Sequence, residues 1–313
     1  MADILAITGP IYLAIALGYV STRSGWFTRA DMRVFGQFVI RLALPGLLFN
    51  AVASRDIADI VNPSYLLAYS GGTLLVIVLG LAWGKRQRLP LTDNVVAVMG
   101  MSCSNSGYVG YPILLLTLAP VAAVSLALNM MVENLLVIPL LLVLAERGRD
   151  GGGHGLQMLR RIARQLATNP LIIALMLGLL VALMGWRLPE PLTRSINLFA
   201  SASAGLSLFV IGGTLFGLPL EGMGRQIAPI VVGKLLLHPL GVALATLALP
   251  LIGLPALDAS LQLAAVMLAA MPMMGIYPIL AQSYGKQDLG AAALLVTTVV
   301  SFFTLSGLLW LTR

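Results

Sequence analysis

The chain has 313 residues, of which 59% are hydrophobic and only 10% are charged, and its net charge is +7. Soluble domains carry about 25% charged residues, so this composition excludes an ordinary soluble protein and indicates an integral membrane protein. The basic excess does not indicate a nucleic-acid partner, because the charges lie in short hydrophilic gaps between apolar runs, as topology signals do.

Ten apolar segments are candidates for membrane-spanning helices, each of which needs about 20 residues. The first resembles a signal-peptide core, but Asp3 stands where basic residues would be expected, so we predict a retained span. The predicted fold class is an all-α polytopic membrane protein. The segments lie at roughly 4–21, 34–53, 64–84, 93–116, 120–145, 170–187, 195–217, 226–249, 258–284 and 289–311.

Basic residues are distributed unevenly between alternate loops, with Arg41 and Lys234 falling inside spans. By the positive-inside rule, the richer set of loops is cytoplasmic and both termini are non-cytoplasmic. The richer set contains Arg23, Arg29, Arg33, Lys85, Arg86, Arg88, Arg147, Arg149, Arg160, Arg161, Arg164, Arg225 and Lys286. The poorer set contains Arg55, Arg187, Arg194 and Arg313.

The longest hydrophilic stretch divides five spans from five. We expect residues 1–145 to form the first five-helix repeat, 146–169 a cytoplasmic linker and 170–313 the second repeat. Because each half has an odd number of spans, the second half must insert upside down, which predicts an inverted repeat. Within the linker, Leu156–Leu166 fits either a basic amphipathic helix on the inner membrane face or a plain connection.

Two of the spans are interrupted at matching places. Met101–Leu114 reads MSCSNSGYVGYPIL and Met271–Leu280 reads MPMMGIYPIL, so the tetrapeptide YPIL recurs after 166 positions. Asp93 and Asp258, which are 165 positions apart, are suited to cap the starts of these spans. A single proline kink is usually structural, but paired interruptions in two halves are typical of a transporter's binding site.

We predict two helices that break near the bilayer centre and cross there. The second half-helices should begin at Pro112 and Pro278, with positive ends that suit a carboxylate. The first break adds polar side chains, whereas the second has methionines that suit the non-polar part of a substrate. The candidate substrate-binding residues are Ser104, Asn105, Ser106, Gly110, Tyr111, Pro112, Gly275, Tyr277 and Pro278.

Ionisable residues inside spans are expensive and usually functional. Glu133 and Asn134 lie in the fifth span, while Lys234 and His238 lie four residues apart, on one face of the eighth. We predict a coupling or support site here, either an ion pair or a proton site. The alternative is that Lys234 snorkels and His238 caps a carbonyl freed by Pro239. Arg41 is read as snorkelling to the cytoplasmic side rather than binding substrate.

The interrupted region also resembles a known family. Asn105–Pro112, NSGYVGYP, is similar to the Asn-Thr-Gly-x-x-Gly-x-Pro signature of the auxin efflux carrier family, which includes bacterial malonate and malate carriers. Leu44–Phe49, LPGLLF, resembles that family's proline motif in span 2, and the resemblance covers the whole chain.

The resemblance implies an elevator-type carrier that forms a homodimer. Spans 1, 2, 6 and 7 would form the scaffold, and spans 3–5 and 8–10 the moving transport domain. It also implies that Asn105 contacts the substrate carboxylate. The second break lacks an extra polar residue that some auxin carriers have, which argues against auxin itself.

These observations predict a secondary transporter of small organic anions, such as malonate or malate, in the bacterial inner membrane. Its partners would be a small carboxylate and the lipid bilayer, with no cofactor or metal, and with Na+ or H+ as the coupling ion left open. The alternatives are a sodium/proton antiporter and a sodium-coupled carrier of larger organic anions. An enzyme is not expected, because no carboxylate cluster accompanies His154 or His238.

Overall fold

The protein is helical throughout the part that the structure describes. The computed structural model describes residues 2–53, 62–150, 160, 163–164, 167–186, 188–217 and 224–311. Within these ranges every regular element is a helix, and the pairing of extended backbone is an isolated antiparallel bridge between Ser104 and Met273. The predicted all-α class is therefore confirmed. Most of the predicted linker segment 156–166 lies outside the described residues.

The chain divides into two compact units. Unit 1 comprises Met1–Asn62, Ser106–Met130 and Ala167–Gly217, and unit 2 comprises Pro63–Asn105, Met131–Leu166 and Leu218–Arg313. Each unit draws on both halves of the sequence, and two of the boundaries fall inside the fourth and fifth predicted spans. The repeat and the division into scaffold and moving domain remain predictions.

Unit 1 is built on close helix packing at glycines. The first helix packs on α13, where a Cβ atom at Gly18 or Gly212 would collide with a carbonyl oxygen of the facing helix. Small residues of this kind let membrane helices approach closely. The helices of unit 1 are α1 (Ala2–Arg23), α2 (Arg29–Phe38), η1 (Val39–Ala43), α3 (Leu44–Ala53), η2 (Ser106–Gly110), α7 (Tyr111–Thr117), most of α8 (Ala119–Val132), α11 (Pro170–Met184), α12 (Glu190–Ser201) and α13 (Ser203–Leu215).

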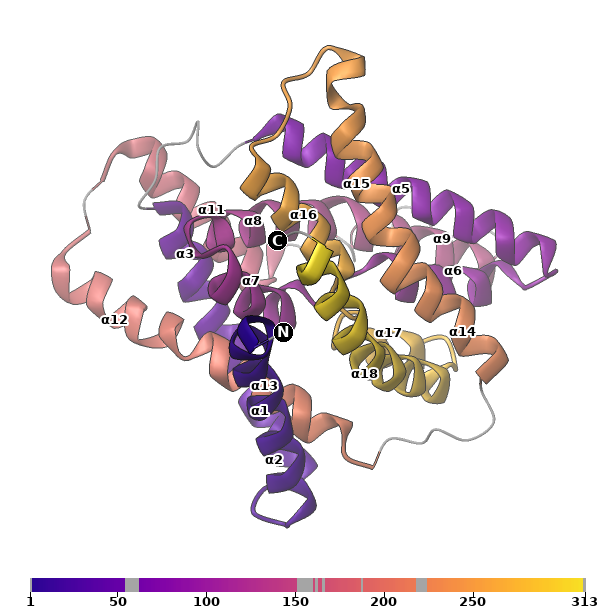
Figure 1. Ribbon diagram of the computed structural model, residues 1–313, viewed down its shortest axis with the longest axis horizontal. Helices are drawn as coiled ribbons and strands as arrows, with labels where there is room; N and C mark the ends of the chain where they lie inside the picture. Colours follow the sequence, from indigo (N-terminus) through magenta and orange to yellow (C-terminus); the bar gives the residue numbers. More distant parts are fainter. Residues whose placement is uncertain are drawn as a thin grey trace. The chain divides into compact units, whose positions relative to one another are not determined.

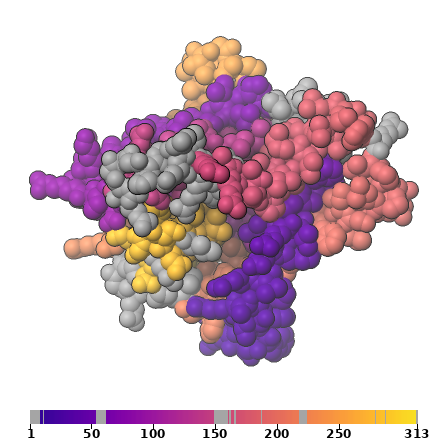
Figure 2. Space-filling view, turned by 180° about the vertical axis from the view of Figure 1, so that it is seen from behind, coloured from indigo at the N-terminus to yellow at the C-terminus, as the bar shows by residue number. Residues whose placement is uncertain are grey.

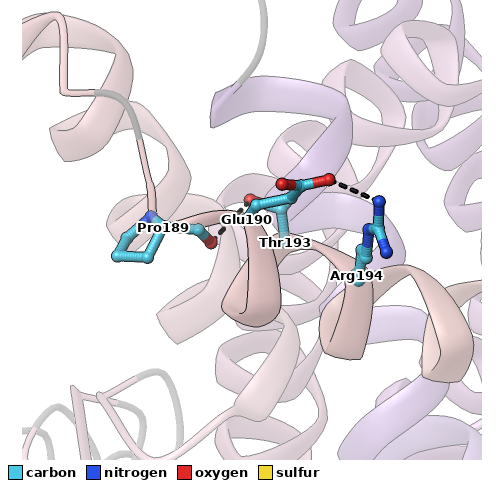
Figure 3. A network of polar contacts seen from close by, with 4 residues as sticks. All are labelled: Pro189, Glu190, Thr193 and Arg194. Atoms are coloured by element: carbon cyan, nitrogen blue, oxygen red, sulfur yellow. Dashed lines mark hydrogen bonds and ion pairs between the residues drawn. The ribbon is translucent and has the colours of Figure 1, made fainter.

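The start of α12 is an exposed, polar helix end in unit 1 (Figure 3). The hydroxyl of Thr193 donates to the carbonyl of Pro189, the N-cap residue, at 3.4 Å, and Arg194 pairs with Glu190 one turn earlier. An exposed pair of this kind contributes at most about 1 kcal/mol. Its charged side chains are suited to water rather than lipid, at the place where the sequence predicts a loop between the sixth and seventh spans.

Unit 2 contains two long helices that pack closely, α5 and α15. A Cβ atom at Gly72 of α5 would lie 2.5 Å from the Cα atom of Val242 in α15. The short α17 lies along the last helix, α18 (Figure 1). The helices of unit 2 are α5 (Pro63–Arg86), α6 (Leu91–Ser102), η3 (Glu133–Val137), α9 (Ile138–Asp150), α14 (Gly224–Val232), η4 (Gly233–Leu237), α15 (His238–Ala248), η5 (Leu249–Ile252), α16 (Ala259–Ala270), α17 (Tyr277–Gln282) and α18 (Gln287–Leu311).

The described helices are those of a multi-pass membrane protein. Six continuous helices are long and apolar enough to cross a bilayer, and two shorter apolar helices, α11 and α16, accompany them. Many large apolar side chains are exposed, as expected where lipid replaces water. An example is η5, which projects at the edge of unit 2 (pale orange in Figure 2) and leaves Leu251 86% exposed.

Candidate functional site

Two segments of unit 2 that interrupt predicted spans leave helical geometry and pair with each other. Between α6 and η2, Cys103–Asn105 is extended, and α16 and α17 are separated by Met271–Ile276. The Asn105 N–H donates to the Pro272 carbonyl at 2.8 Å, and the Met274 N–H donates to the Cys103 carbonyl at 3.2 Å. We call these paired segments, residues 103–105 and 272–274, the crossing. Its backbone groups satisfy each other, as a buried chain without helix requires.

The α-helices that follow the two segments, α7 and α17, each have a proline in the first turn, but another helical element, η2, precedes α7. After the second segment, α17 begins at Tyr277 with Pro278 in its first turn. After the first, helical structure resumes at Ser106 as the π-helix η2 and continues into α7, so Pro112 does not begin it. The small residues of η2, Ser106, Gly107 and Gly110, are compatible with this π-helical turn.

Asn105 is the most distinctive side chain of the crossing. The residue is 3% exposed, and its amide nitrogen Nδ2 has no hydrogen-bond partner within the described structure. A Cβ atom built on Gly275 would lie 3.7 Å from this nitrogen. A buried donor without an acceptor costs about 1–3 kcal/mol, so Asn105 presents an amide suited to an acceptor group that the chain does not supply.

Lys234 lies beside the crossing and is completely buried. Its Nζ donates to the Ser104 hydroxyl at 2.8 Å and to the Ala269 carbonyl at 2.6 Å, and lies 2.9 Å from Nδ1 of His238. An ammonium group has three donors and no acceptor, so these contacts satisfy it fully. The alternative reading, in which Lys234 snorkels to the membrane surface, is wrong.

His238 joins Lys234 to α5 through an ordered chain of hydrogen bonds. Because Nδ1 accepts from Lys234, the ring proton is assigned to Nε2, which lies 3.0 Å from the Thr73 hydroxyl. Thr73 in turn donates to the Tyr69 carbonyl at 2.7 Å, and the Tyr69 ring meets the imidazole edge-on. His238 therefore does not cap a carbonyl freed by Pro239. Tyr69 and Thr73 were missed from sequence, although their spacing of four puts both on one helix face.

Glu133 approaches the crossing from the other side of Ser104. The residue is 3% exposed, and its Oε1 accepts the Ser104 backbone N–H at 2.9 Å. Ser104 thus meets the carboxylate through its backbone and the ammonium through its side chain. Asn134, the next residue in η3, is half-buried. The structure therefore brings together three of the four predicted coupling residues: Glu133, Lys234 and His238.

The remaining predicted site residues lie in one unit or the other, and all except Gly275 and Pro278 are buried. In unit 2, the Tyr277 hydroxyl donates to the Val96 carbonyl at 3.1 Å. In unit 1, the Asn129 amide donates to the Ser106 hydroxyl at 2.6 Å, and Gly110, Tyr111 and Pro112 follow in the same helical run. No group of three or more potential metal ligands occurs among the described histidine, cysteine and acidic residues. Cys103, the single cysteine, is fully buried in the crossing.

The comparisons with known proteins all match this chain to transporters. A family model described as "Membrane transport protein" matches residues 7–309. The "Putative malonate transporter" of Rhizobium meliloti is 33% identical over 322 aligned positions, which cover 100% of this chain and 97% of that protein. The "Uncharacterized transporter YfdV" of Escherichia coli K12 is 26% identical over 251 positions, covering 76% of this chain and 77% of the relative.

Proposed function

Because this chain belongs to the membrane transport protein family that includes the auxin efflux carriers, and is a transporter rather than an enzyme, we propose that it carries small dicarboxylates such as malonate or malate. The full-length similarity to a protein named as a malonate transporter supports this substrate class. Transport is secondary, driven by the gradients of the substrate or of a coupled ion.

The observation that carries the proposal is the Asn105 amide. It is a buried donor without a partner, at a point where two chain segments leave helical geometry and pair. A substrate carboxylate offers the acceptor that this amide lacks, and a hydrogen bond to a charged group contributes about 1.5–3 kcal/mol. Gly275, which has no side chain, places no group of its own against the amide. Asn105 is therefore assigned to the substrate carboxylate.

The proposed architecture has ten spans in a 5+5 inverted repeat. Its fourth span is α6 with η2 and α7, and its ninth is α16 with α17; the two are broken and cross at the paired segments. Each predicted segment contains helix in its described residues, which supports this count. By the uneven distribution of basic residues, both termini are placed outside the cytoplasm of a bacterial inner membrane.

The proposed mechanism is elevator-type alternating access in a homodimer. Spans 1, 2, 6 and 7 form the scaffold, and spans 3–5 and 8–10 carry the substrate site across the membrane. The resemblance to the auxin efflux carriers supports this assignment, as does the polar network that ties the third, fourth, fifth, eighth and ninth spans together around Ser104.

A thermal-unfolding screen of the purified protein tests the substrate class. Malonate and malate should raise Tm, because a ligand that binds only the folded state stabilises it by mass action, by about 2.7 kcal/mol at a hundredfold excess over Kd. Acetate and sulfate serve as controls for charge alone. If inorganic cations raised Tm and no carboxylate did, a sodium/proton antiporter would replace the proposed carrier.

A further inference from the structure

The Lys234 ammonium is bound at the crossing in the way that a metal cation would be. It touches Ser104 of the first interrupted segment and Ala269 in the last turn of α16, just before the second. The carbonyls in the last turn of a helix have no intrahelical partner. One amine on η4 therefore holds an oxygen from each of the two interrupted regions.

The surroundings of this amine are negative. Both α6 and α16 end at the crossing, and each helix C-terminus carries about half a negative charge. The Glu133 carboxylate adds a formal charge on the far side of Ser104. The crossing thus gathers nearly two negative charges in a buried place, and Lys234 supplies a positive charge there.

We propose that the Lys234 ammonium is the built-in counter-cation of the crossing, and that this transporter therefore works without a bound sodium ion. In carriers with interrupted helices, unwound carbonyls and the C-terminal ends of half-helices coordinate the coupling Na+. Here one such carbonyl, that of Ala269, binds a cation that is covalently part of the chain, together with the Ser104 hydroxyl and His238. The inference goes beyond the proposed substrate class and rests on the proposed function only where uptake is measured.

The third partner of the amine favours an ammonium over a hard cation such as Na+, because hard cations prefer oxygen ligands. Nδ1 of His238 is an acceptor fixed by the Nε2 contact to Thr73, and an imidazole acceptor suits an N–H donor. Removing the side chain in Lys234→Ala leaves three acceptors around a space of ammonium size. A small free ammonium should therefore refill that space better than Na+, and bulky choline should not refill it.

The direct test is the thermal unfolding of Lys234→Ala in detergent, without substrate, in equal concentrations of methylammonium, sodium and choline chloride. Methylammonium should raise the Tm of the variant by about 2–4 °C relative to choline. Methylammonium should leave the Tm of the wild type unchanged. Lys286→Ala is the matched control, because its amine pairs with Asp93 at 2.8 Å in a partly exposed place, and it should show no selective effect.

The second test is uptake of radiolabelled malonate into proteoliposomes whose external salt is sodium, potassium or choline chloride. The wild type should give equal rates in all three. Lys234→Ala should lose about tenfold or more, as expected when a buried network loses its donor, and methylammonium should restore part of the rate. The uptake rate of Lys234→Arg, which keeps the charge, should fall between the rates of the wild type and of Lys234→Ala.

Two results would overturn the inference. One is wild-type uptake, or wild-type Tm, that rises selectively with sodium, which would reveal a separate Na+ site; this measurement stands even if Lys234→Ala does not fold. The other is a folded Lys234→Ala that matches the wild type with no added ammonium. A protein that takes up no dicarboxylate would defeat the proposed substrate instead, and the unfolding experiment would still decide the role of Lys234.

Discussion

The two interrupted segments of the crossing pair through their backbones and have opposite side-chain chemistry. On one strand of the pair, Ser104 and Asn105 carry hydroxyl and amide groups, whereas Met273 and Met274 stand on the other. Both strands use main-chain donors and acceptors to hold each other. The difference teaches that the pairing needs only backbone groups, so the side chains of the two segments are free to differ. The polar side chains of the first segment are the ones that we propose bind substrate.

Asn105→Ala tests the difference between the two segments most directly and should have the largest effect. The substitution removes the side-chain amide that lacks a hydrogen-bond partner. It keeps the backbone hydrogen bond to the Pro272 carbonyl, so the fold should be retained. Uptake of malonate should fall about 100-fold, the equivalent of losing one hydrogen bond to a charged group. Initial-rate measurements in proteoliposomes check this. A loss of uptake from Met274→Ala as large as that from Asn105→Ala would show that recognition is shared equally.

Glu133→Gln should have the next largest effect. The glutamine carbonyl can still accept the Ser104 N–H, but the charge that balances Lys234 is lost, and unbalancing a buried pair costs about 3 kcal/mol. We expect lower Tm and about tenfold slower uptake, with a changed dependence on pH. The control is Glu146→Gln, because Glu146 accepts from the Tyr284 hydroxyl away from Lys234. An unaltered pH profile in both Glu133→Gln and Lys234→Ala would remove the coupling role.

Gly275→Ala sharpens the comparison at the second segment. The new methyl group would make an ordinary contact with the Asn105 amide rather than a clash, so stability should change by less than about 1 kcal/mol. Because the methyl group partly covers the donor, the Kd for dicarboxylates should rise severalfold, about 1 kcal/mol. Ligand titrations monitored by Tm measure this. Equal affinity in the variant would mean that the substrate approaches Asn105 from another side.

Met273→Leu should have the smallest effect. Met273 is fully buried, and its part in the bridge to Ser104 is a backbone pairing. Swaps that conserve volume usually cost less than about 1.5 kcal/mol, so uptake should remain within about twofold of the wild type. Denaturation and uptake measured side by side check this. A large loss would assign the methionine side chain to the substrate.

Much of the fold could be predicted from sequence because apolar runs and their interruptions are local signals. The described residues of the ten predicted segments are mainly helical, and the polar interruption at Ser104 and Asn105 coincides with extended backbone. Pro112 lies in the first turn of α7, but helical structure already precedes it, because proline is tolerated inside a run that begins as a π-helix at Ser106.

The partners of Lys234 could not be predicted from sequence. Ala269 contributes a carbonyl oxygen, which every residue has, and Thr73 contacts His238 across 165 positions. Nothing in the local sequence distinguishes these residues from their neighbours. The sequence left open whether Lys234 lies in a support site or snorkels, because only its partners decide between the two.

Because Cys103 is fully buried in the crossing, its chemical labelling can report on opening of the paired segments in the unmodified protein. Since the chain has a single cysteine, any thiol-specific label on the unmodified protein must have reacted with Cys103 in the crossing. The rate of maleimide attachment therefore follows how often those segments come apart, and it does so without a cysteine-free background. Slower labelling with malonate present would mean that bound malonate holds the two paired segments together.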